Sequence, residues 1–121
     1  MKRPEAALQR AVVQYLHTQE AMGRLTFFAV PNGGKRGLIE AANFKREGAR
    51  PGVPDLVILL PEDHTAMIEL KAPKGRASKN QTEFMDRARQ FTPNVFVVRD
   101  LESAKQTIDN LIRAFPKRVA A

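Results

Sequence analysis

GVPDLVILL, at residues 52–60, and TAMIELK, at residues 65–71, are the two segments that decide the fold of this chain. Each contains a short apolar run, and the PEDH between them suits a hairpin loop, so we predict two antiparallel strands. Because successive side chains of a strand point to opposite faces, Glu69 and Lys71 share one face. The hairpin brings Asp55 opposite these residues, and a shift of one residue in register places its side chain on their face.

The residue types of this predicted cluster suit metal-dependent hydrolysis of a phosphodiester. The carboxylates of Asp55 and Glu69 can hold Mg²⁺ or Mn²⁺ through hard oxygen ligands, together with the backbone carbonyl of Leu70 and with waters. A metal ion lowers the pKa of a bound water and neutralises charge on a phosphate oxygen. Lys71 can orient or help to deprotonate that water, or stabilise the pentacovalent phosphate.

A purely structural interpretation of the same residues is also open. Asp55 can belong to a turn, and Glu69 and Lys71 can face solvent on one side of the sheet. Two details favour a site. After Asp55 itself, the strand at residues 55–60 is apolar on both faces, as in a central strand that is covered on both sides. Gly52, just before them, allows a close approach of the backbone.

The rest of the chain predicts further elements around this hairpin. Pro4 suits the first position of a helix, Asp100 suits an N-cap, and Ser78 with Gln81 fits a capping box. In chain order we expect a helix at 4–17, a strand at 25–30, a helix at 38–47, strands at 56–60 and 65–71, a helix at 78–90, a strand at 94–98 and a helix at 101–115. The predicted fold class is α/β, with a mixed central sheet flanked by helices, and residues 1–121 form a single domain. The core is expected to include Phe27, Phe28, Phe91 and Phe96.

The composition limits the class of protein. Of the 121 residues, 43% are hydrophobic and 27% are charged. No apolar run approaches the roughly 20 residues of a transmembrane helix, and the first residues lack the apolar stretch of a signal peptide. There is no cysteine, which excludes disulfides and thiolate metal sites, so we expect a cytoplasmic protein. The net charge of +7 favours a polyanionic partner such as nucleic acid.

The hairpin residues resemble the signature of a known superfamily. Pro54-Asp55 and Glu69-Leu70-Lys71 match the P-D…E-x-K pattern of the PD-(D/E)XK nucleases, whose core is restriction-endonuclease-like. More narrowly, the chain resembles the VRR-NUC family, the virus-type replication-repair nucleases. The matching pieces come in the family's order: the opening helix with Glu5, PNGG at residues 31–34, GVPDL at 52–56, IELK at 68–71, and Ser78 with Gln81 in the next helix.

This resemblance implies a metal-dependent, structure-specific endodeoxyribonuclease that acts on branched DNA such as a Holliday junction. It also implies a homodimer, of the stand-alone type found in bacterial or phage-infected cells. Glu5 would join Asp55 and Glu69 at the metal, and Gln81 would lie near the metal or its water. The sequence leaves simpler roles open, because Glu5 suits the positive end of the helix dipole and Gln81 suits the capping box.

Basic residues flank the predicted site in two places, in a turn before it and in the loop after its second strand. Phosphate groups of DNA are the expected partners of such residues, although a solvated surface is the alternative. The expected DNA-binding residues are Asn32, Lys35, Arg36, Lys74, Arg76 and Lys79.

Two other functions are compatible with the same pattern. A non-catalytic DNA-binding or recombination-accessory protein can use the same fold, and a nuclease assay with Mg²⁺ or Mn²⁺ separates it from an enzyme. A restriction-type nuclease that reads a base sequence is the other candidate, but we see no spare segment for a recognition domain.

Overall fold

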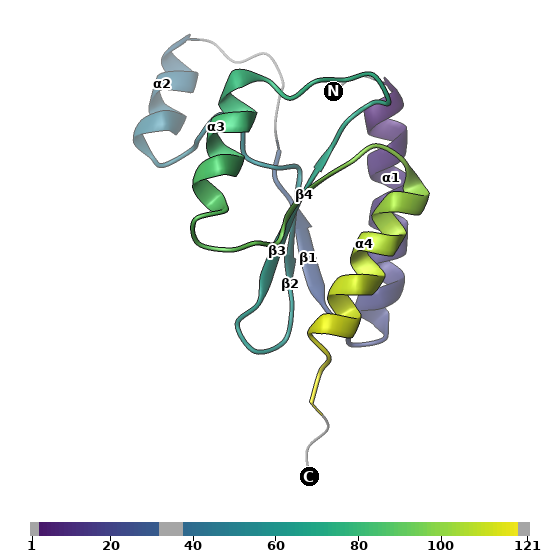
Figure 1. Cartoon of the computed structure of the whole chain (residues 1–121). Helices are drawn as coiled ribbons and strands as arrows, with labels where there is room; N and C mark the ends of the chain where they lie inside the picture. Colours follow the sequence, from purple (N-terminus) through teal and green to yellow (C-terminus); the bar gives the residue numbers. More distant parts are fainter. Residues whose placement is uncertain (1–2, 32–37, 119–121) are drawn as a thin grey trace.

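The computed structural model describes residues 3–31 and 38–118, and its elements follow one another in the predicted order (Figure 1). They are α1 (Arg3–Ala21), β1 (Thr26–Ala29), α2 (Leu38–Arg46), β2 (Leu56–Leu59), β3 (Thr65–Leu70), α3 (Lys79–Ala88), β4 (Val95–Val98) and α4 (Leu101–Ala114). The predicted N-cap of the last helix is also present, since the Asp100 side chain accepts a hydrogen bond from the Ser103 amide at 2.7 Å. The α/β fold class is therefore confirmed.

The main difference in boundaries is at the end of α1. The helix continues to Ala21, a full turn beyond the predicted end, and the chain then turns at Gly23 with a φ of +74°. The next inward position after Leu16 is Gln19, which is buried and accepts a hydrogen bond from Arg24 at 2.8 Å. Because a polar residue occupies this buried position, the apolar pattern stops before the helix does, and the predicted helix was too short.

The sheet is mixed, with strand order β1-β2-β3-β4. β2 is antiparallel to β1 and to β3, whereas β3 and β4 are parallel. In the hairpin Leu56 pairs with Ile68, so one residue earlier Asp55 is level with Glu69. This register includes the one-residue shift that places both side chains on the same face.

Helices cover the two faces of the sheet unequally (Figure 1). α1 and α4 pack together on one face, and α3 lies on the other, with α2 beyond it. The core between the sheet and the α1–α4 pair contains fully buried Leu16, Ile58, Ile68 and Ile108. No helix in the described part of the chain is long and apolar enough to span a membrane.

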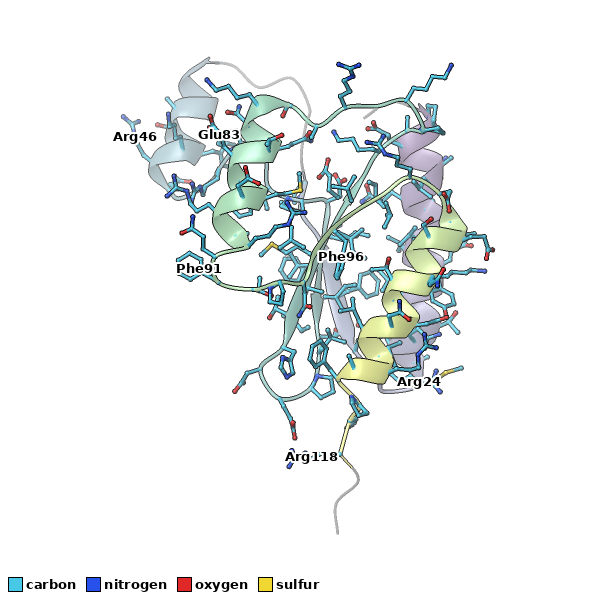
Figure 2. All side chains as sticks on the ribbon, in the orientation of Figure 1. Arg24, Arg46, Glu83, Phe91, Phe96 and Arg118 are labelled. Carbon is cyan, nitrogen blue, oxygen red and sulfur yellow. The ribbon has the colours of Figure 1, made fainter. Side chains whose placement is uncertain are left out.

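The prediction of four core phenylalanines was wrong for two of them. Phe27 and Phe96 pack against the core, but Phe28 is 51% exposed and Phe91 is 85% exposed. Phe28 lies on the edge strand β1, on the opposite face from Phe27, where α1 and α4 do not reach. Phe91 follows the end of α3 and projects outward, whereas Phe96 lies within the body of the molecule (Figure 2).

Candidate active site

Three charged side chains are buried together at one end of the hairpin. Asp55 directly precedes β2, Glu69 lies near the end of β3, and Lys71 follows β3. Only 6%, 2% and 7% of these residues, respectively, is exposed. Charged groups are rarely this buried unless they are paired or bind an ion. The interpretation in which Glu69 and Lys71 face solvent is therefore wrong.

Asp55 is fixed by the backbone of the strands beside it. Its Oδ2 accepts a hydrogen bond from the Leu70 amide at 2.8 Å, and its own carbonyl accepts one from the Val30 amide at 2.8 Å. Asp55 therefore joins the sheet on both sides, and its carboxylate stays at the end of β3.

Glu69, Lys71 and Gln81 form a hydrogen-bonded group. Lys71 Nζ lies 3.2 Å from Glu69 Oε2 and donates to Gln81 Oε1 at 2.6 Å. Gln81 Nε2 donates to Glu69 Oε2 at 2.8 Å. Each end of the Gln81 amide thus contacts the charge that suits it, oxygen on the ammonium and nitrogen on the carboxylate. We refer to Asp55, Glu69, Lys71 and Gln81 together as the polar cluster.

The first turn of α3 places Gln81. Ser78 is the N-cap, and its hydroxyl accepts from the Gln81 amide at 3.2 Å while its own amide donates to Gln81 Oε1 at 2.8 Å. The predicted capping box is confirmed. The Gln81 side chain also reaches Glu69 and Lys71. Gln81 therefore caps the helix and contacts the buried charges at the same time.

The electrostatics of Glu69 are dominated by its burial. Burial raises the pKa of Glu69 from 4.5 to about 7, the charge of Asp55 adds to this shift, and Lys71 opposes it. Glu69 Oε1 is buried and has no hydrogen-bond partner within the described residues. A buried carboxylate oxygen that lacks a partner and lies near a second carboxylate fits a divalent cation, which prefers such oxygen ligands.

Glu5 reaches the same region from α1 but contacts the backbone. Its Oε1 accepts a hydrogen bond from the Ala72 amide, one residue after Lys71, at 3.4 Å. Across residues 3–31 and 38–118, no three His, Cys, Asp or Glu side chains are grouped so that they could hold a metal ion together. The roles predicted for Glu5 and for the Leu70 carbonyl at a metal stay predictions.

Arg99 makes contacts that sequence reasoning missed. Its guanidinium donates to the backbone carbonyls of Ala72 at 3.0 Å, Pro73 at 3.5 Å and Gly75. These carbonyls belong to the loop between Lys71 and α3, so Arg99 holds the segment that joins the two parts of the polar cluster. The sequence offers one signal for this, because Arg99 follows the strand that pairs in parallel with β3 and therefore ends beside it.

The loop after β3 carries exposed basic residues. Lys74, Arg76 and Lys79 are exposed, and Lys79 Nζ lies 3.9 Å from the carboxylate of Glu83 on α3. Surface ion pairs of this kind are weak, so the lysine can exchange its partner for a phosphate. DNA contact by these residues stays a prediction. Outside the described residues lie Asn32, Lys35 and Arg36.

Solved structures with a similar fold include two whose descriptions are informative. One, described as a VRR_NUC domain protein, matches with a TM-score of 0.71 at 22% identity, over 93% of this chain and 91% of that one. Another, described as a VRR_NUC domain, matches with a TM-score of 0.63 at 23% identity, over 89% of this chain and 97% of that one. No match is found among curated proteins.

The sequence gives the more direct comparison. Residues 2–100 match the VRR-NUC domain, and this range includes every residue of the polar cluster. VRR-NUC domains have a nuclease-type, DNA-processing fold, which agrees with a mixed sheet that buries two carboxylates beside a lysine. The resemblance predicted from the motifs is thereby confirmed, and the chain belongs to the VRR-NUC family.

Proposed function

We propose that this protein is a metal-dependent, structure-specific endodeoxyribonuclease that hydrolyses phosphodiester bonds in branched DNA. The observation that carries the proposal is Glu69 Oε1, which is buried beside Asp55 and has no partner among the described residues. Leaving such an oxygen unpaired costs about 1–3 kcal/mol or more. Mg²⁺ or Mn²⁺ held by Asp55 and Glu69 would remove this cost and neutralise the repulsion between the two carboxylates.

Each residue of the polar cluster has its own role in this proposal. Asp55 and Glu69 would hold the ion, with the Leu70 carbonyl as a further ligand and Glu5 approaching from α1. When bound, the ion supplies an acidified water and neutralises charge on the phosphate. Lys71 orients the attacking water and stabilises negative charge that develops on the phosphate. Gln81 keeps the Lys71 ammonium in place through their 2.6 Å hydrogen bond.

The proposed substrate is bound through its phosphate backbone. The net charge of +7 supports this, as do the exposed basic residues that follow Lys71, namely Lys74, Arg76 and Lys79. Further contacts are assigned to Asn32, Lys35 and Arg36 in the turn before the hairpin. The preference for branched DNA such as a four-way junction, and the homodimer, rest on resemblance to stand-alone members of the family. A two-fold dimer would present paired sites to a junction of similar symmetry.

A panel of DNA substrates tests this function. Four-way junctions, flaps and linear duplexes of matched length are incubated with Mg²⁺, with Mn²⁺ or with EDTA, and light scattering gives the oligomeric state. We expect cleavage with either metal, none with EDTA, faster cleavage of branched substrates, and a mass of two chains. Faster cleavage of linear duplex would contradict the assigned substrate class.

Two variants separate an enzyme from a DNA-binding protein. Asp55→Ala and Lys71→Ala are expected to lower the cleavage rate by roughly 10²-fold or more while junction binding is retained. Lys74→Ala serves as the charge-matched control for Lys71→Ala, and should weaken binding with little effect on the rate of bound substrate. Junction binding by the wild-type protein without cleavage under either metal would overturn the proposal in favour of an accessory DNA-binding role.

A further inference from the structure

The turn at Pro51 and Gly52 lies directly against the first turn of α3. The φ of Gly52 is +83°, and a methyl group at this residue would lie 2.4 Å from the carbonyl carbon and oxygen of Asn80 and 2.6 Å from the Gln81 nitrogen. Side-chain carbons essentially never approach such atoms within 3.0 Å. The two backbones can therefore touch only because residue 52 has no Cβ.

A second contact joins the same segment to the next turn of the helix. The guanidinium of Arg50 lies over the ring of Phe84, 5.3 Å from its centre, and Phe84 is one helical turn beyond Asn80. At its other end the segment continues into buried Pro54 and Asp55, which the Leu70 amide holds at 2.8 Å. The short stretch at residues 50–55 thus contacts the first two turns of α3 and also contains Asp55, one of the carboxylates of the polar cluster.

The peptide that Gly52 touches is the one that carries Gln81. The side chain of Gln81 must reach Lys71 at 2.6 Å and Glu69 at 2.8 Å, so its position depends on how closely the first turn of α3 approaches the sheet. We propose that Gly52 is a positioning residue: its missing side chain sets the depth of this turn and thereby places the Gln81 amide between Glu69 and Lys71. The inference rests on the proposed nuclease function for its kinetic consequence.

Gly52→Ala gives a defined kinetic expectation. The added methyl forces the first turn of α3 away by on the order of 1 Å, which breaks hydrogen bonds of normal length and leaves Lys71 without its amide partner. Because misplacement of this size can cost about 10²-fold in rate, we expect kcat to fall roughly 10- to 100-fold. KM for DNA should change less than kcat, since Lys74 and Arg76 lie outside the displaced turn and only Lys79, among the basic residues after Lys71 assigned to phosphate contacts, lies within it.

Gly48→Ala is the matched control. Gly48 also has a positive φ, +102°, but a methyl group there would meet nothing within 4 Å. Both substitutions therefore introduce backbone strain, and only Gly52→Ala adds the collision with α3. We expect Gly48→Ala to keep kcat within about threefold of the wild-type value, since surface changes are usually mild. Equal effects of the two substitutions would overturn the inference.

A double-mutant cycle tests whether Gly52 acts through Gln81. In the Gln81→Ala background, measured by single turnover, Gly52→Ala should change the cleavage rate by less than about threefold. If the two losses multiply instead, Gly52 does not act through Gln81 and the inference fails. A wild-type protein that cleaves no DNA would refute the proposed function itself, which is a different outcome.

A readout without metal or DNA completes the test. The side-chain amide resonances of Gln81, observed by NMR in EDTA, should shift in Gly52→Ala and stay unchanged in Gly48→Ala. If Gly52→Ala does not fold, Arg50→Ala replaces it, because it releases the same segment from Phe84. Unchanged Gln81 resonances in the substituted protein would overturn the inference.

Discussion

Glu69 holds its proton close to neutral pH when no cation is bound. Burial is the main cause, Asp55 adds to the shift, and Lys71 opposes it, with a resulting pKa of about 7. A divalent cation needs the ionised carboxylate, so its binding must release this proton. In the proposed enzyme, metal affinity is therefore expected to increase as the pH rises through about 7.

In the metal-free protein, ionisation of Glu69 should also make the free energy of unfolding depend on pH. The folded state holds the Glu69 proton more tightly than the unfolded chain, whose pKa is near 4.5, so the stabilisation is full below pH 4.5 and is lost as pH rises through about 7. At about 1.4 kcal/mol per pKa unit, the loss is at most about 3–4 kcal/mol. Urea denaturation in EDTA checks this, with Glu69→Gln as the variant that cannot ionise. A stability difference between the two proteins that does not change with pH would contradict it.

Single residues of the site differ in how far the sequence predicts them. Asp55, Glu69 and Lys71 follow from strand alternation and one hairpin loop, because their contacts are local. The Leu70–Asp55 hydrogen bond joins residues 15 positions apart. The contacts of Arg99 with Ala72 and of Glu5 with Ala72 span 27 and 67 positions. No periodicity or capping rule links residues at such separations. These contacts could therefore be identified only from the three-dimensional structure.

At the scale of elements, the loop between β3 and α3 is held by its neighbours. Arg99 donates to its carbonyls from the end of β4, and Glu5 accepts from Ala72 at its start. Within the loop, the Gly75 amide donates to the Ala72 carbonyl at 2.9 Å. This bracing fixes the distance between Lys71, which precedes the loop, and Ser78, which begins the helix that carries Gln81.

Arg99→Lys should loosen this loop without changing the net charge. A lysine ammonium is compact and cannot reproduce the planar fork that reaches several carbonyls at once. We expect faster amide hydrogen exchange at Gly75 and a loss of about 1 kcal/mol in the free energy of unfolding. Arg113→Lys is the control, since Arg113 is exposed and donates to Asn110 within its own helix. Equal exchange rates at Gly75 in both variants would refute the bracing role.

The order and type of the helices and strands were predictable from the sequence. Which face of each strand the helices cover was not. Apolar runs and caps predicted each helix and strand that the described residues form, because such elements depend on short-range patterns. Phe27 and Phe28 illustrate the limit: both lie in the same short strand, and only the packing of helices on one face decides which is buried. Gln19 illustrates the converse, since its burial depends on the hydrogen bond from Arg24.

At the scale of the whole molecule, the family match ends where α4 begins. The match covers residues 2–100, whereas α4 buries Ala104, Ile108 and Leu111 in the core. α4 also joins α1 through a hydrogen bond from the Tyr15 hydroxyl to Asp109. α4 therefore completes, together with α1, the helical layer that covers one face of the sheet.

A chain that ends at residue 100 is expected not to fold. Losing a large buried side chain costs about 2–5 kcal/mol, and removing α4 takes away two of them, Ile108 and Leu111, out of a total stability of about 5–15 kcal/mol. Circular dichroism and urea titration check this. A chain that ends at residue 118 is the control and should melt cooperatively. A cooperative transition in the shorter chain would contradict the expectation.

The distribution of charge predicts how DNA binding depends on salt. Each phosphate contact adds about 0.9 to the slope of log affinity against log salt concentration. Lys74→Ala and Arg76→Ala should each reduce the slope by about one. Lys117→Ala should leave it unchanged, because the segment that follows α4 and the loop between β3 and α3 lie at opposite ends of the molecule (Figure 1). Fluorescence anisotropy with a four-way junction measures these slopes, and an equal reduction by Lys117→Ala would refute the assigned surface.

The hairpin and the helix after it supply the whole polar cluster from one nearly continuous stretch of the chain. The contacts among Asp55, Glu69, Lys71 and Gln81 and with the Leu70 amide join residues at most 15 positions apart, whereas the Tyr15–Asp109 contact spans 94. Such a stretch can be inherited as a unit. Insertions in loops outside this stretch would therefore leave its internal contacts intact.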